Sequence, residues 1–142
     1  MKSEVIAMFP ISNAHVDRIF KLKRNVFVKY THFSRLNTGS KIVFYVSGKK
    51  KLVGEGIIER IEKIDPEIAW ARHKQQIFLN EDEYYRYALE SPIGGKNRKE
   101  SKITVFILKK VKKYKTAVEW KCGFTLAGRY LTPEDYAKTV NQ

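Results

Sequence analysis

The feature that most constrains the fold is a pair of strand-like segments joined by a short turn. Residues 42–46 (Ile-Val-Phe-Tyr-Val) are β-branched or aromatic, and residues 52–64 return after the turn-forming segment 47–50 (Ser-Gly-Lys-Lys). Gly54 and Gly56 lie on one face of the returning segment, and such glycines mark a bend, a bulge or the close approach of another backbone. The pattern therefore predicts a long hairpin within a strongly coiled sheet or small barrel.

Shorter elements are expected on either side of this hairpin. Ser12, Asn80 and Thr132 are suited to cap helices, and Pro66 and Pro133 are tolerated at a first helical position. The patterns predict helices at residues 12–23, from 65 onward, 81–89 and 133–140, and strands or connectors at residues 5–9, 26–30, 76–79, 102–112 and 117–122. This order predicts an α+β fold, a mixed β-pseudobarrel flanked by short helices, and excludes a doubly wound sheet.

Composition limits the chain to one basic domain. The 142 residues are 43% apolar and 13% aromatic, enough for a core within a single domain spanning 1–142. The apolar stretch before Pro10 is too short for a signal peptide, and no window approaches the roughly 20 apolar residues of a membrane helix. Cys122 is the one cysteine, which excludes an internal disulfide and a structural zinc site. We therefore expect a cytoplasmic protein without a membrane partner.

Positive charge is concentrated in two blocks. The sequence holds 28 Lys and Arg against 15 Asp and Glu, a net charge of +13. Between Asp17 and Glu55 there are ten basic residues and no acidic one, and residues 96–115 hold nine basic residues against Glu100. The more acidic segment 80–90 separates the two blocks. Lysines can simply keep a surface hydrated, but two blocks that meet on one face would bind phosphates.

Aromatic residues alternate with the first basic block and include Phe27, Tyr30, Phe33 and Tyr45. Half or more of these rings should be buried, since barrel strands bury one face; Phe44 is expected in the core and Tyr45 on the other side. Exposed rings beside cations would stack on bases. The candidate nucleic-acid-binding residues are Lys23, Arg24, Asn25, Phe27, Lys29, Tyr30, Arg35, Tyr45, Lys109, Lys110, Lys112 and Lys113.

Three segments resemble a known superfamily. They are residues 33–46 (FSRLNTGSKIVFYV), residues 52–56 (LVGEG) and the tail 124–136 (FTLAGRYLTPEDY). In order and spacing they are similar to the PUA-like superfamily, with the EVE, YTH and ASCH domains as the nearest branches. The resemblance leaves out residues 65–100 and points to a small archaeal family of uncharacterised proteins. It implies a PUA-like pseudobarrel that binds RNA or reads a modified base.

The resemblance also implies a position for an aromatic base cage. EVE and YTH relatives carry a cage tryptophan in an Asn-Val-Trp-like stretch after the first helix, and here that stretch is Asn25-Val26-Phe27. Phenylalanine can still stack on a base, with a smaller face and no indole N–H. Phe27 is therefore either a platform for a base or a core residue, and both interpretations stay open on the sequence.

Catalytic patterns are sparse. His15, His32 and His73 lack metal-ligand spacing, so we expect no metal and no cofactor. Cys122 has no histidine nearby to activate it as a nucleophile. The function predicted from the sequence is a non-catalytic RNA-binding domain, whose partner is tRNA, rRNA or a modified base, with no indication of its oligomeric state.

Two other functions remain as alternatives. Some ASCH domains are amidohydrolases of acylated cytidine that use a lysine, a threonine three residues later and a distant glutamate. Here Lys21 and Lys23 are followed at that spacing by arginine and valine, and Glu55 or Glu59 corresponds to the glutamate. The missing threonine weighs against an enzyme of this type acting on a modified nucleoside. The second alternative is a basic protein-interaction module that meets an acidic partner.

Overall fold

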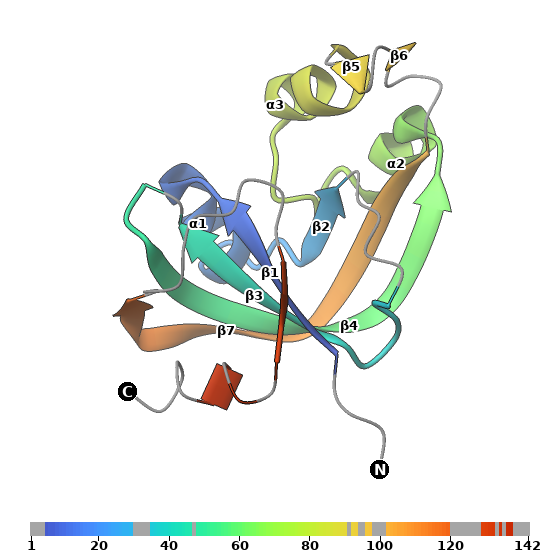
Figure 1. Cartoon of the computed structure of the whole chain (residues 1–142). Coiled ribbons are helices and arrows are strands. Elements are labelled where there is room, and N and C mark those ends of the chain that lie inside the picture. Colours follow the sequence, from blue (N-terminus) through green and yellow to red (C-terminus); the bar gives the residue numbers. More distant parts are fainter. Residues whose placement is uncertain are drawn as a thin grey trace.

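The fold is a mixed sheet with short helices, seen in a computed structural model (Figure 1) that describes residues 5–29, 35–46, 48–90, 92–93, 96–97, 102–119, 129–132, 134 and 136–137. The six-stranded sheet has the order β2-β7-β4-β3-β1-β8. Its strands are β1 (Ile6–Ile11), β2 (Val26–Lys29), β3 (Lys41–Val46), β4 (Lys51–Ile64), β7 (Ile103–Glu119) and β8 (Arg129–Leu131). The helices are α1 (Asn13–Phe20), α2 (Pro66–His73), α3 (Glu81–Tyr85) and the π-helix η1 (Arg86–Glu90), and a small sheet pairs β5 (Pro92–Ile93) with β6 (Lys96–Asn97).

The predicted hairpin is confirmed as the centre of the sheet. β3 and β4 pair antiparallel, β4 continues antiparallel along β7, and β1 joins β3 in parallel. β4 and β7 curve together beneath the other strands to the side where β4 leads into α2 (Figure 1). The pairing of β4 with β7 shifts register at three places, and such bulges increase the local bend.

Gly54 allows α1 to approach this curved sheet. A Cβ atom at Gly54 would lie 2.3 Å from Cζ of Phe20 and 2.6 Å from the Lys112 carbonyl oxygen. The close approach expected at this glycine is therefore confirmed, and it comes from the last residue of α1 on one side and from the backbone of β7 on the other.

A methyl group at position 54 should destabilise the fold. We expect Gly54→Ala to lower the free energy of unfolding by about 1–3 kcal/mol, because the Lys112 backbone cannot yield as a flexible side chain can. Gly48→Ala is the matched control, since a Cβ there would meet nothing within 4 Å. Urea denaturation measures both variants, and equal stability of the two would contradict this role of Gly54.

The sheet buries side chains on both faces, and β3 shows the division. Phe44 belongs to the larger core, which packs against α1, whereas Tyr45 lies in a smaller core on the other face with Leu52 and Leu131. The placement of Phe44 and the opposite orientation of Tyr45 are confirmed. Tyr45 is 0% exposed, however, because β8 and neighbouring side chains cover that face. Tyr45, a candidate nucleic-acid-binding residue, therefore has no exposed surface with which to contact a nucleic acid.

β2 is buried on both faces, although a barrel strand was expected to bury only one. Val26, Phe27 and Val28 are all at most 3% exposed. β2 pairs with β7 along one edge, while Val26 forms a bridge with Ile77 along the other. The connector around Ile77 therefore covers a strand that was expected to present one side to solvent.

Several predicted boundaries were wrong. Residues 102–112 and 117–122 were expected as two strands, but β7 runs unbroken from Ile103 to Glu119. Pro10 lies inside β1 rather than ending it, since β1 continues its parallel pairing with β3 to Ile11. The pairing of β8 with β1 was not anticipated. The predicted closing helix is represented by Glu134, Tyr136 and Ala137, which are helical.

Some residues that the sequence analysis named lie outside the described residues. They are Tyr30, His32, Phe33, Trp120 and Cys122.

Two kinds of feature are absent from the described residues. No helix among them has the length and apolarity needed to cross a membrane. Within the same ranges, no group of three or more His, Cys, Asp or Glu side chains is arranged to hold a metal ion.

Candidate functional site

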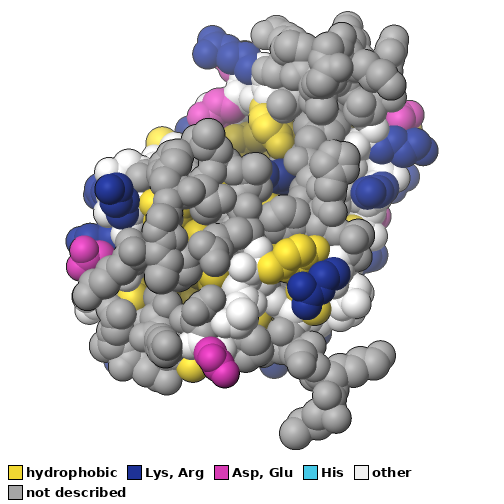
Figure 2. Space-filling view, viewed as in Figure 1, with side chains coloured by type: hydrophobic (Ala, Val, Ile, Leu, Met, Phe, Trp, Pro, Cys, Tyr) yellow, Lys and Arg dark blue, Asp and Glu magenta, His cyan; other side chains and the backbone are white. Residues whose placement is uncertain are grey.

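A cavity of about 670 Å³, cavity 1, opens between the body of the sheet and α3. It is lined by the end of β1, the start of α1, β2, the connector after α2 and the first residues of η1. The lining residues are Pro10, Ile11, Ser12, His15, Phe27, Val28, Lys29, Phe78, Leu79, Glu83, Arg86 and Tyr87. In Figure 2, hydrophobic side chains lie next to acidic and basic ones near the top of the view.

Aromatic rings form part of the wall of cavity 1. The Phe27 and Phe78 rings stack with centroids 4.9 Å apart, and the His15 ring meets Phe78 edge-on at 5.0 Å. Phe27 also contacts the rings of Phe9 and Phe44, so it is fixed by the core behind it. Cavity 1 therefore has a rigid apolar floor whose rings cannot move independently of the fold.

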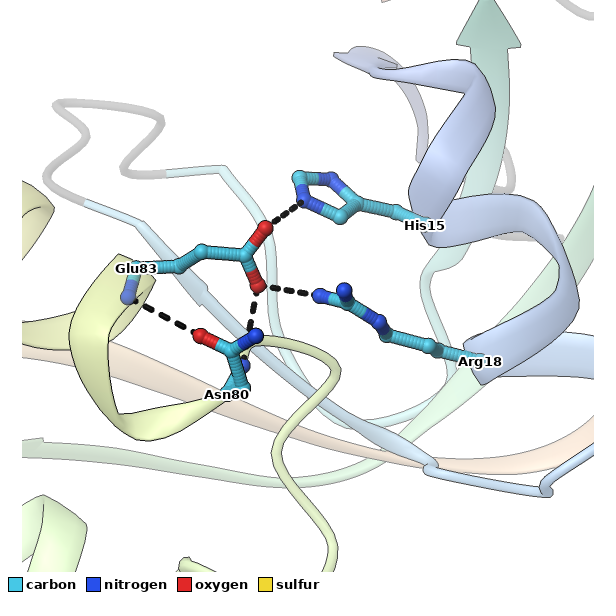
Figure 3. Close-up of polar contacts among 4 residues, drawn as sticks. All are labelled: His15, Arg18, Asn80 and Glu83. Carbon is cyan, nitrogen blue, oxygen red and sulfur yellow. Dashed lines mark hydrogen bonds and ion pairs between the residues drawn. The ribbon is translucent and has the colours of Figure 1, made fainter.

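A polar cluster borders this floor and joins α3 to α1 (Figure 3). Asn80 and Glu83 form a capping box at the start of α3, with backbone-to-side-chain hydrogen bonds of 3.0 Å in both directions. Arg18 of α1 pairs with the same carboxylate. Burial alone would raise the pKa of Glu83, but the hydrogen bonds from Asn80 and Arg18 and the charge of Arg18 hold that pKa below its ordinary value. Glu83 is therefore a fixed anion.

His15 is neutral at pH 7 and keeps one ring nitrogen unpaired. Burial lowers its pKa, the Glu83 carboxylate opposes this effect and Arg18 adds to it. Its Nε2 lies 3.5 Å from Oε2 of Glu83, and an ionised carboxylate only accepts, so Nε2 carries the proton. His15 Nδ1 is then a buried acceptor without a hydrogen-bond partner. This nitrogen exposes less than 1 Å² of surface, so it does not offer an acceptor to the open space of cavity 1.

The α3 side of cavity 1 is an irregular helix. α3 changes into the π-helix η1 at Arg86, and Arg86 and Tyr87 both line the cavity. π-helical turns are rare and occur frequently at functional sites. Sequence reasoning identified the Asn80 cap but not the change of helix type, and it placed no role on His15, Glu83 or Arg86.

A second cavity of about 610 Å³, cavity 2, brings the two basic blocks together. Lys23 and Asn25 from the first block and Lys109 and Lys110 from the second all line it, with Glu59 as its acidic residue. Asn25 ties the two sides, since its Nδ2 donates to the Leu108 carbonyl oxygen at 2.9 Å. The remaining lining residues are Ile19, Phe20, Leu108 and Val111.

The other candidate residues lie apart from cavity 2. Lys29 lines cavity 1, and its Nζ lies 5.7 Å from the centroid of the Phe9 ring. Arg35 is exposed and covers the Tyr130 ring at 4.8 Å. Arg24 is half-buried, and Lys112 and Lys113 are exposed on β7. Tyr30 lies outside the part of the chain that the structure describes.

A buried ion pair on the other face of the sheet was missed by sequence reasoning. Glu55 is 3% exposed, and Lys41 Nζ lies 3.1 Å from its Oε2. Tyr114 donates to Glu55 Oε1 at 2.9 Å, and Tyr136 donates to the same oxygen. Burial would raise the pKa of Glu55, but these hydrogen bonds and the Lys41 charge hold it below its usual value. The cluster lines neither cavity 1 nor cavity 2, and it anchors Tyr136 to the sheet.

Comparison with known proteins assigns the sequence to a family. A family model described as "Domain of unknown function (DUF365)" matches residues 5–133. The chain belongs to the DUF365 family. A similar relative is the uncharacterised protein MJECS03 of the archaeon Methanocaldococcus jannaschii, 29% identical over 106 residues that cover 72% of this chain and 98% of the relative.

Solved structures confirm the fold expected from the resemblance. The ASCH protein of Zymomonas mobilis superposes with a TM-score of 0.73 at 18% identity, covering 94% of this DUF365 chain and 92% of that protein. The N-terminal domain of McrB from Staphylothermus marinus superposes with a TM-score of 0.57 at 14% identity, covering 100% and 98%. At these identities the likeness shows the fold alone, an ASCH-like fold of the PUA-like type.

Proposed function

We propose that this DUF365 chain is a non-catalytic RNA-binding domain that takes an unpaired base into cavity 1. The observation that supports this most strongly is the combination of a rigid aromatic floor with charged side chains of both signs, Glu83 beside Lys29 and Arg86, at the wall of one cavity. An unpaired base matches this arrangement, because its faces are apolar and stack on aromatic rings, while its edge carries hydrogen-bonding groups.

The dimensions and charges of cavity 1 suit such a ligand. Its volume of about 670 Å³ lies within the usual range of roughly 300–1,000 Å³ for small-ligand sites. Donors on the base edge meet the Glu83 carboxylate, while Lys29 and Arg86 bring positive charge to the same cavity. Phe27 stays in the core and acts by closing the floor of cavity 1, not as an exposed platform.

Filling cavity 1 should weaken RNA binding without unfolding the protein. Ser12 is exposed, lines the cavity and makes no side-chain hydrogen bond to α1. We expect Ser12→Trp to raise the Kd for a labelled single-stranded RNA by about 5- to 150-fold, the value of one stacked base. Fluorescence anisotropy titration at physiological salt measures the change.

Asn13→Trp is the matched control, because Asn13 is exposed next to Ser12 but does not line cavity 1. It should bind RNA as the wild type does. Equal affinity of the two tryptophan variants would contradict base binding in cavity 1. Recovery of no RNA above background after crosslinking in cells would contradict RNA binding altogether and favour an acidic protein partner.

A second candidate function rests on one specific observation. Lys23 and Glu59, two residues considered for an ASCH-type amidohydrolase, line the same cavity 2. The position three residues after Lys23 is the buried Val26, so the threonine of that pattern is absent. Turnover of acylated cytidine that Glu59→Gln abolishes would favour this enzyme over the binding domain.

A further inference from the structure

Cavity 2 holds an unusual pair of backbone conformations. Among the described residues, three that are not glycine have a positive φ, and all three are lysines: Lys23 at 55°, Lys50 at 53° and Lys110 at 51°. Lys50 lies in the turn between β3 and β4, where such a conformation is common. Lys23 and Lys110 are far apart in sequence, yet both line cavity 2.

Left-handed backbone is costly for a side chain with a Cβ, and glycine or asparagine is the usual residue there. Lys110 belongs to a bulge of β7, because Lys109 to Lys112 faces only Ile57 to Glu55 of β4. Bulges re-aim side chains and are frequent beside functional sites. Because lysine occupies both left-handed positions of cavity 2, where glycine would be less strained, we infer that the two ammonium groups have a function there.

The charge of cavity 2 is not neutralised by its surroundings. Lys23, Lys109 and Lys110 make no ion pair with any residue in the described ranges, and Glu59 is the one carboxylate that lines the cavity. Three ammonium groups against one carboxylate leave an excess of two positive charges. An anion entering this cavity would meet unpaired cations from the segment between α1 and β2 and from β7, which the Asn25–Leu108 hydrogen bond joins.

Cavity 2 lies close to cavity 1 along the chain. β2 leads from Asn25 beside cavity 2 to Phe27 and Lys29 in cavity 1, a span of about 7–13 Å at the rise of an extended strand. α1 connects the same two cavities, with His15 in one and Phe20 in the other. Lining residues of the two cavities therefore lie about 7–13 Å apart along β2, a separation that a dinucleotide spans.

We propose that cavity 2 is a phosphate-binding site, which holds a phosphodiester of the RNA strand whose base enters cavity 1. This inference rests on the proposed function and adds a second site to it. Lys23, Lys109 and Lys110 contact the phosphate oxygens, Asn25 positions the two walls, and Glu59 limits how tightly a free anion is held.

Glycine substitutions at the two left-handed positions test the lysine charges without destabilising the fold. Lys23→Gly with Lys110→Gly removes two ammonium groups at positions where glycine adopts the same backbone freely, so the melting temperature should not fall. We expect the Kd for a single-stranded RNA to rise at least tenfold at about 0.1 M salt. The slope of log affinity against log salt should shrink by about 1.4, or 0.7 for each lost phosphate contact.

Lys50→Gly with Lys63→Ala is the matched control, since it removes two exposed charges away from both cavities, one of them at a left-handed position. Its salt slope should equal that of the wild type. Equal slopes for the control and the cavity 2 variant would overturn the phosphate site.

An abasic ribose–phosphate oligomer has phosphates but no bases, so its binding tests the phosphate site independently of base binding in cavity 1. The phosphate site requires the abasic strand to bind more weakly to the cavity 2 variant than to the control, whether or not Ser12→Trp matters. Glu59→Gln should tighten abasic binding, because it removes the carboxylate from the cavity. Unchanged or weaker abasic binding in Glu59→Gln, or its loss of acylated-cytidine turnover, would overturn the inference in favour of the enzyme.

Discussion

Phe27→Ala should lower the free energy of unfolding by about 3–5 kcal/mol, one of the largest losses expected from a single substitution in this protein. The ring is 3% exposed and contacts four other phenylalanine rings, those of Phe9, Phe44, Phe78 and Phe106. Truncation leaves a cavity lined by rings from three strands and from the connector that carries Phe78, and these rings cannot close it. Chemical denaturation with a fluorescence readout measures the loss.

Phe27→Leu is the control, since it keeps most of the apolar volume and should cost under about 1.5 kcal/mol. The folded fraction of Phe27→Leu should still bind RNA. A stable Phe27→Ala protein with strongly reduced RNA affinity would contradict the core position and restore the role of an exposed base platform.

Glu55→Gln should be similarly damaging, with an expected loss of about 3–5 kcal/mol. Glu55 is buried and accepts from Lys41, Tyr114 and Tyr136, so its removal leaves the partly buried Lys41 ammonium without its counter-charge. Glu59→Gln, four residues along β4 at an exposed position, should stay within about 0.5 kcal/mol of the wild type. Equal stability of the two variants would contradict the buried ion pair.

The same ion pair sets a pH window for stability. The pKa of Glu55 is lowered below 4.5, so its contribution is present above pH 4.5 and is lost as the pH falls through the folded pKa. Burial opposes the charge of Lys41, but hydrogen bonds to Tyr136 and Glu55 outweigh it and raise its pKa above 10.5. The Lys41 contribution is present below pH 10.5 and is lost as the pH rises above the folded pKa. Glu55→Gln should flatten the acid limb of a melting-temperature profile.

Much of the fold could be predicted because its central hairpin is encoded locally. The β-branched and aromatic residues of β3 and the spacing of the glycines in β4 are enough to predict the two strands and their bend. β7 was divided wrongly because its second half, Lys112–Glu119, lacks apolar alternation and is held by pairing with β4. Such non-local pairing has no local signal in the sequence.

The candidate site was predicted less completely, for the same reason. The two basic blocks do meet at cavity 2, but the burial of Phe27 and Tyr45 depends on a connector and on β8 that pack over them. The contact between His15 and Glu83 joins residues 68 positions apart. The sequence indicated Asn80 as a cap, but not that its capping-box partner Glu83 would meet His15 and Arg18 of α1.

Base entry into cavity 1 is tested most directly by titrating the wild type and Ser12→Trp with a single-stranded RNA and with its abasic counterpart. The wild type should prefer the intact strand by about 5- to 150-fold, and Ser12→Trp should bind the two strands with nearly equal affinity. Equal affinity of the wild type for both strands, or a preference that survives in Ser12→Trp, would contradict the account.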